Sequence, residues 1–232
     1  MKKILFATFL LLFLTGISSA QKLLPIKPSV EIFLKGALGT PLSNDDFKDH
    51  FKSFPGGQLE VIGNITPHFG VYGNFSADFL SPKEKSLIGA TYIEDNTYII
   101  SGSVGPRYYF NLPGSILYRF FADVGLGIYA TRLGDETRTT NLTPASATTY
   151  TLYHNSYTQI GFNAGAGINI GLGPIGMANL TIKYHSLLKK SEVNVINSIT
   201  TSNGSVNAGE PQDVPAVSYF SIAVGLGFKL GL

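Results

Sequence analysis

The sequence has 232 residues, of which 14% are charged, whereas soluble domains average roughly 25%. Its 17 Lys and Arg include Lys2 and Lys3, and without these two the chain carries 15 basic and 15 acidic residues. This balance gives no support to nucleic-acid binding. The chain contains no cysteine, which excludes disulfides and a lipoprotein anchor.

Residues 1–20 have the pattern of a secretory signal peptide. Lys2 and Lys3 form its positive end, residues 4–14 its apolar core, and residues 18–20 a small-residue cleavage site. The apolar core is too short for a membrane-spanning helix. We therefore expect cleavage after Ala20, a periplasmic segment at 21–28, and one domain at 29–232.

Eight later segments alternate apolar with small or polar residues, at the period of two that is typical of β-strands. In the last segment the even positions from Phe220 to Leu232 are all apolar. The odd positions from Tyr219 to Gly231 are mostly small or polar. Because side chains alternate sides along a strand, each strand has one apolar face. The predicted strands are about 29–40, 57–66, 68–80, 97–110, 116–130, 157–170, 177–188 and 217–231.

The connections between these segments alternate in length. Three are short turns that contain Pro, Gly or Asn, at 66–68, 111–114 and 171–176. Four are longer and rich in Ser, Thr, Asn, Asp and Pro, at 41–56, 81–96, 131–156 and 189–216. Short periplasmic turns and long extracellular loops are typical of outer-membrane barrels. We therefore predict an all-β fold, an eight-stranded antiparallel up-and-down transmembrane β-barrel with both termini in the periplasm.

A soluble barrel or sandwich would show the same period, with its apolar face inward. Its polar face would meet water and would carry many Lys, Glu and Thr. Here that face is mostly Gly, Ala, Ser and Asn, which suits the crowded interior of a small barrel. Aromatic residues at the strand ends predict two membrane-interface girdles. They are Tyr98, Phe79 and Phe220 at the outer ends, and Phe69, Tyr108, Phe110, Tyr118 and Phe228 at the periplasmic ends.

These residues resemble the small outer-membrane β-barrels of Gram-negative bacteria, namely the OmpA transmembrane domain, OmpX, OmpW-like proteins and the broader outer membrane protein β-barrel domain group. The resemblance covers about 29–232. It implies an integral outer-membrane protein in contact with lipid. It also implies a terminal signal read by the barrel-assembly machinery, carried here by Phe228, Leu230 and Leu232. Leu232 stands where an aromatic residue is usual.

Ionisable residues on the inward face are the candidate functional residues. A charge in a narrow lumen is costly unless it is paired. The first interpretation is an ion-pair network that fills the barrel, which the width of an eight-stranded barrel favours. The alternative is a gated proton or ion path, or a small polar ligand site. The residues are Glu31, Lys35, Glu60, Asp78, Arg107, Arg119, Asp123, Lys183, His185 and Lys229.

An enzyme has little support. His154-Asn155-Ser156 resembles the His-x-Ser spacing of outer-membrane lipid A deacylases, but it falls in a predicted loop. No Asp or Glu follows between Tyr157 and Ile182 to complete a triad. His185 and Ser186 lie on opposite faces of a strand. The four histidines show no metal-ligand spacing, so we expect neither catalytic residues nor a cofactor.

We therefore expect a non-enzymatic barrel with a structural or surface-interaction role carried by the four long loops. A narrow porin for small or hydrophobic solutes is the alternative, and a lipid A-modifying enzyme is the third hypothesis. The expected partners are outer-membrane lipid, the assembly machinery, and a surface ligand or protein. The sequence leaves the oligomeric state open.

Overall fold

The computed structural model describes residues 29–43, 45–83, 90–111, 117–140, 148–193, 196–201, 204–206 and 211–231. The predicted signal peptide, the segment 21–28 and Leu232 lie outside the described residues. Within these ranges, no helix has the length and apolar character needed to cross a membrane.

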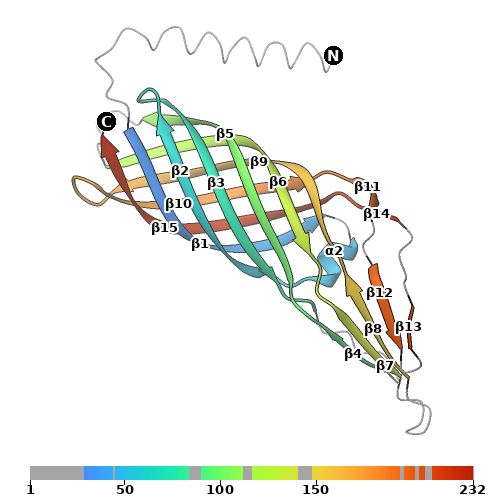
Figure 1. The fold of residues 1–232 in the computed structure, drawn as a ribbon. Helices are drawn as coiled ribbons and strands as arrows, with labels where there is room; N and C mark the ends of the chain where they lie inside the picture. Colours follow the sequence, from blue (N-terminus) through green and yellow to red (C-terminus); the bar gives the residue numbers. More distant parts are fainter. Residues whose placement is uncertain are drawn as a thin grey trace.

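Eight long strands close into one antiparallel barrel, which confirms the predicted fold class (Figure 1). Each strand pairs with its neighbour in the chain, and the last strand pairs with the first, from Ser29 opposite Gly231 to Ser43 opposite Ser218. Closure leaves no free sheet edge, which is the requirement for a sheet in lipid. The strands are β1 (Ser29–Ser43), β2 (Phe54–Asn64), β3 (Phe69–Leu80), β5 (Thr97–Asn111), β6 (Tyr118–Arg132), β9 (Ser156–Gly171), β10 (Gly176–Leu187) and β15 (Val217–Gly231).

The barrel has apolar side chains on its outer face and polar side chains in its lumen. Apolar residues such as Leu34 and Leu126 face outward and are 72% and 69% exposed. Polar residues that alternate with them, such as Lys35 and Ser221, are buried in the lumen. A soluble barrel would have the opposite distribution. The barrel wall therefore suits a hydrocarbon surrounding, as the small inward-facing residues predicted.

Aromatic side chains border this apolar belt at both ends. Phe79 and Tyr98 pack edge to face, with ring centroids 5.6 Å apart, at the end that carries the long connections. Tyr108 and Phe110 pack similarly, with centroids 5.0 Å apart, at the end that carries the short turns. These positions agree with the two expected girdles.

Inward-facing glycines make room for large side chains that cross the lumen. A side chain at Gly125 would overlap the hydroxyl of Tyr72, and one at Gly167 would overlap the ring of Phe121. Small residues on β6 and β9 therefore accommodate the aromatic residues of other inward-facing positions.

The long connections contain secondary structure that the sequence patterns did not predict. A short helix, α2 (Asp45–His50), lies in the first connection. Beyond the barrel the strands β4 (Ala90–Glu94), β7 (Glu136–Thr140), β8 (Thr148–His154), β12 (Ile196–Thr201) and β13 (Gly204–Val206) form a five-stranded sheet. A smaller sheet pairs β11 (Lys190–Val193) with β14 (Gln212–Val214). We call these two sheets the extension, and Figure 1 shows them at the opposite end of the barrel from the C-terminus.

Candidate functional site

Five charged side chains from five strands meet in the middle of the lumen. The guanidinium of Arg107 on β5 donates to both oxygens of Glu60 on β2, each at 2.9 Å. It also donates to Oδ2 of Asp123 on β6, from Nη2 at 2.5 Å and from Nε at 3.0 Å. Lys35 Nζ lies 2.8 Å from Glu60 Oε1, and Lys183 Nζ lies 3.6 Å from Asp123 Oδ1. We call these residues the central ion network.

Aromatic rings enclose the cations of the central ion network. The guanidinium of Arg107 lies 3.8 Å from the ring centroid of Phe121, and Lys183 Nζ lies 4.3 Å from that of Tyr72. These distances are within the range of cation–π attraction. The hydroxyl of Tyr72 donates to Asn163 Oδ1 at 2.5 Å, which fixes the ring across the lumen.

A second polar group surrounds Glu31 near the turn end. Arg119 Nη1 donates to Glu31 Oε1 at 2.7 Å, and Asn64 Nδ2 donates to the same oxygen at 2.9 Å. Asn169 Nδ2 donates to Glu31 Oε2 at 3.0 Å, and the hydroxyl of Tyr109 does so at 3.4 Å. The buried carboxylate of Glu31 is thus satisfied by four donors, as a buried charge requires.

Hydrogen bonds connect the Glu31 group to the central ion network. Asn179 Nδ2 donates to Asn169 Oδ1 at 2.6 Å, and Thr181 Oγ1 donates to Asn179 Oδ1 at 2.6 Å. Lys35 Nζ donates to Thr181 Oγ1 at 3.4 Å and also pairs with Glu60. A continuous chain of polar side chains therefore runs from partly exposed Arg119 to Lys183.

His185 lies beyond the central ion network, toward the long connections. Its ring stacks on Tyr219, with centroids 4.5 Å apart and planes 8° apart. Its nitrogens lie 3.1 Å from Ser221 Oγ and 3.2 Å from the Tyr129 hydroxyl. The hydroxyl of Tyr219 donates to Asp78 Oδ2 at 3.1 Å. Side-chain packing therefore holds His185 and Asp78 in place.

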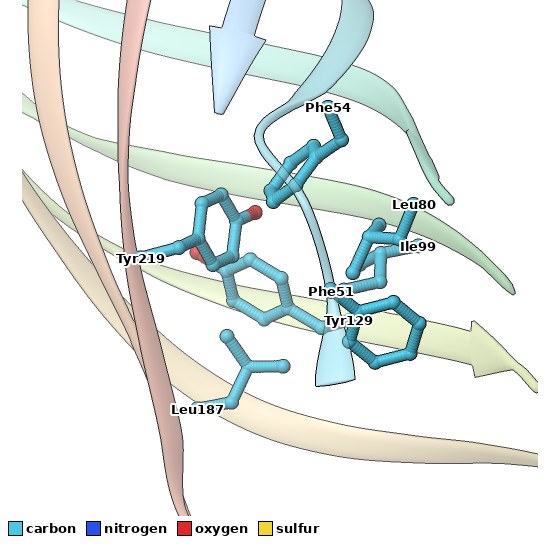
Figure 2. Packing of buried hydrophobic residues seen from close by; sticks show 7 residues of the cluster. All are labelled: Phe51, Phe54, Leu80, Ile99, Tyr129, Leu187 and Tyr219. Carbon is cyan, nitrogen blue, oxygen red and sulfur yellow. The ribbon is translucent and has the colours of Figure 1, made fainter. Parts of the chain in front are cut away.

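An apolar plug closes the lumen at the end with the long connections (Figure 2). Six of its members come from barrel strands, and Phe51 comes from the connection that follows α2. Phe51 forms a β-bridge with Pro82 and packs edge to face on Phe47, with centroids 5.4 Å apart. The connection therefore folds over the mouth of the barrel. The plug consists of Phe51, Phe54, Leu80, Ile99, Tyr129, Leu187 and Tyr219.

Of the ten predicted lumen residues, Lys229 is placed differently from the expectation. It lies near the open turn end, where its side chain is exposed, although its register partner is Glu31. Among the described residues it forms no ion pair within 4.0 Å. The strand parity was right, but the position lies too close to the strand end to be enclosed.

The sequence reasoning overlooked the uncharged members of these groups. Tyr72, Tyr219, Asn163, Asn169 and Asn179 are all buried in the lumen. Tyr72, Tyr219 and Asn179 share the strand parity of a predicted ionisable residue, and Asn163 and Asn169 share that of the inward glycines of β9, so the alternation contained the signal. The prediction covered only acidic side chains, basic side chains and histidine.

The described residues offer no metal centre, since they contain no group of three or more His, Asp or Glu side chains arranged to hold an ion. The His154-Asn155-Ser156 segment also lacks a catalytic arrangement. The ring Nδ1 of His154 lies 2.7 Å from the carbonyl oxygen of Gly134, and its backbone amide donates to Asp135. His185 approaches Ser221 rather than Ser186, and both partners are sealed in the lumen.

A polar cluster outside the barrel ties α2 to the extension. His50 Nε2 lies 2.6 Å from Glu94 Oε1, and the hydroxyl of Tyr92 donates to Glu94 Oε2 at 2.6 Å. Arg138 pairs with Glu136 and lies over the ring of Tyr92. Partial burial, together with the hydrogen bond to Glu94, raises the pKa of Tyr92, which therefore stays protonated as a donor. The cluster fixes β4 against the segment that closes the mouth.

A closed barrel with an apolar outer belt and a charged, filled interior defines the class of protein. The chain has the fold of the small eight-stranded outer-membrane β-barrels, as the sequence resemblance predicted. The outer membrane protein OprG of Pseudomonas aeruginosa is 15% identical, with a TM-score of 0.51 over 89% of this chain and 97% of that one. A major outer membrane protein of Thermus thermophilus is 10% identical, with a TM-score of 0.52 over 87% and 99%.

A third similar structure is Ail of Yersinia pestis, solved in complex with the heparin analogue sucrose octasulfate. It is 14% identical, with a TM-score of 0.43 over 88% of this chain and 98% of that one, which is too low to support an argument. No protein-family model and no curated protein matches the sequence. At these identities the similarity establishes the fold alone.

Proposed function

We propose that the protein is a non-enzymatic integral barrel of the outer membrane, exported through a cleaved signal peptide, with both termini in the periplasm. Its role in this proposal is to display the extension outside the cell as an interaction surface. The observation that carries the proposal is the contrast between a filled lumen and a structured sheet beyond its mouth.

The filled lumen supports a role outside the barrel. Eight-stranded barrels are only just wide enough for their own side chains. Here the central ion network and the plug occupy the lumen at two levels. Charged partners at hydrogen-bond distance would have to separate before an ion could pass, which is costly in a desolvated site.

The extension supports binding of a protein or another weakly charged partner. Ile93 is 61% exposed, and Tyr150 and Tyr153 are also exposed, on a sheet otherwise rich in threonine. Exposed aromatic and aliphatic side chains on a rigid sheet are common in interfaces. The four long connections carry 11 acidic and 8 basic residues, so they do not form a basic surface for a polyanion.

A matched pair of variants tests this role. Intact cells that display the full-length protein should be retained on protein-coated surfaces, and cells without it should not. Ile93→Ser with Tyr153→Ser should reduce retention. Ile175→Ser is the control, because Ile175 is 64% exposed at the turn end, which the proposal places in the periplasm. Equal retention without the protein, or equal loss in the control, would contradict the proposal.

A narrow transport barrel is the second candidate. The observation that favours it is the continuous polar chain from Arg119 to Lys183. Liposome swelling with small solutes separates it from the first proposal, because only a conducting lumen produces swelling. A lipid A-modifying activity, the third hypothesis, would change the mass of lipid A in cells that express the protein.

The terminal strand is proposed to carry the signal for the assembly machinery. Phe228 and Leu230 are exposed on the outward face of β15, where a second protein can reach them during insertion. Phe228→Ser with Leu230→Ser should leave the protein as an unfolded precursor in the periplasm. Normal insertion of this variant would contradict the assignment.

A further inference from the structure

The outer wall of the barrel contains an apolar groove of about 660 Å³ over β2, β3, β5 and β6. Two outward-facing glycines, Gly73 on β3 and Gly102 on β5, lie on its floor. A methyl group added at either position would meet nothing within 4 Å, so the two glycines leave a real depression in the wall. Its volume is in the range of ligand pockets.

The strand register shows how the groove forms. Gly73 lies between Val61 and Val104 in one cross-strand row. Gly102 lies between Phe75 and Ile128 in the next row. Each row therefore lacks one side chain, and the two gaps are on neighbouring strands. The walls are Leu59 and Val61 on one side and Leu126, Ile128 and Ile160 on the other.

The groove is at mid-height of the apolar belt, between the two aromatic girdles. Gly73 and Phe75 are close to the middle of the β3–β5 ladder, which runs from Phe69 to Leu80. On the proposed function, on which this inference rests, only the hydrocarbon chains of lipids reach this height.

Charge distinguishes the two membrane surfaces above and below the groove. At the extracellular end of β6 lies exposed Arg132, next to Tyr98 in the ladder. Lys83, three residues beyond β3, is turned toward the cover of the mouth, because its Nζ donates to the carbonyl oxygen of Lys48 at 2.8 Å. The periplasmic connections of these strands, 65–68 and 112–117, contain no Lys or Arg. Arg132 is about 13 Å along β6 from Ile128, at 3.3 Å per residue. An anionic headgroup beside Arg132 would therefore lie about 13 Å along the strand from the groove.

We propose that this groove is a binding site for one acyl chain of a phosphorylated glycolipid of the outer leaflet, with a single phosphate near Arg132. Within lipid, the favourable free energy of binding comes from van der Waals contact, because disordered acyl chains fill the depression poorly. The headgroup adds charge-assisted hydrogen bonds that a zwitterionic phospholipid satisfies less well.

Native mass spectrometry of the refolded full-length protein tests the site with two probes, purified lipid A and phosphatidylethanolamine. The unmodified protein should retain lipid A in preference. Gly73→Leu with Gly102→Leu fills the groove and should reduce lipid A retention about fivefold, or about 1 kcal/mol. The control is Gly36→Leu with Gly57→Leu, at two outward glycines that also have open space but do not line the groove. The control should retain lipid A normally.

The headgroup is tested separately. Arg132→Ser should abolish the preference for lipid A over phosphatidylethanolamine while the control glycine variant keeps it. Equal retention of both probes by the unmodified protein, or equal loss in the groove and control variants, would overturn the site. Gly73→Ala with Gly102→Ala provides a milder filling if the leucine variant fails to refold. If the protein is not an integral membrane barrel, the unmodified protein would not insert into vesicles at all. That outcome differs from equal retention of the two lipid probes.

Discussion

The two ends of the lumen are closed by different means. Toward the turn end, charged and amide side chains from the barrel strands form one connected network. Toward the long connections, the closure is apolar and includes Phe51, which is not part of a strand. The polar closure depends on strand register, because its members come from six strands. The apolar closure also needs a connection to fold over the mouth. The polar closure therefore needs only the barrel strands, whereas the apolar closure also needs the connection that contains Phe51.

The largest expected effect is the loss of Arg107. Arg107→Met leaves the buried carboxylates of Glu60 and Asp123 without their main partner, which should cost about 3–5 kcal/mol in free energy of unfolding. Urea unfolding in detergent, followed by circular dichroism, measures this. Arg132→Met, at an exposed arginine on β6, is the control and should be nearly neutral.

Removing both charges of a pair tests the energetic coupling within the central ion network. Glu60→Gln combined with Arg107→Met should cost less than the sum of the two single changes, because the uncompensated charge is removed as well. Strict additivity would show that the central ion network contributes no coupling between β2 and β5.

The outer wall provides the third prediction. Val124 is 55% exposed near the middle of β6, and Ala166 is exposed on β9. Arginine at either site should cost about 2–4 kcal/mol in a bilayer, because the midplane does not solvate a charge. Thr149→Arg, on the exposed extension, is the matched control. If both wall variants refolded with unchanged stability, the assigned lipid face would be wrong.

The plug should be less sensitive than the central ion network. Phe51→Ala removes a buried ring, but it leaves no charge unpaired, and the barrel strands remain intact. We expect a loss of about 2 kcal/mol, below the usual range for a buried phenylalanine because the ring comes from a connection. The same urea titration measures it. If Phe51→Ala lowered the free energy of unfolding more than Arg107→Met does, the apolar plug would contribute more to stability than the central ion network.

The smallest effect is expected at Lys229. Because its side chain is exposed at the turn end, Lys229→Ala should change stability by less than about 0.5 kcal/mol. Lys35→Ala, which removes a buried partner of Glu60, should cost several times more. A large loss at Lys229 would mean that it does join the Glu31 group.

The period of two was sufficient to place charges such as Glu60 and Lys183 on the inner face, because it is a local property of a strand. It could not identify their partners. Arg119 and Asp123 lie two inward positions apart on β6, yet Arg119 pairs with Glu31 and Asp123 with Arg107. These pairs follow from barrel closure and register, which bring together residues 88 and 16 positions apart.

The strands of the extension are a second feature that the sequence patterns did not predict. Its strands are rich in Thr, Ser and Asn, which also favour loops, so the composition predicted irregular connections. The segments 136–140 and 148–154 do carry β-branched and aromatic residues typical of strands. The plug was not predictable in this way. Phe51 lies between Phe47 and Phe54 in an otherwise polar segment, and only tertiary packing shows that its ring closes the mouth of the barrel.

The central claim is that the lumen is sealed by its own charges. Single-channel recording of the unmodified, refolded protein in a planar bilayer tests it most directly, with Arg107→Met recorded alongside. The account predicts no stable conductance for the unmodified protein, because Arg107 bridges Glu60 and Asp123 across the lumen. A large, stable, ion-selective conductance in the unmodified protein would contradict it and would favour the transport alternative.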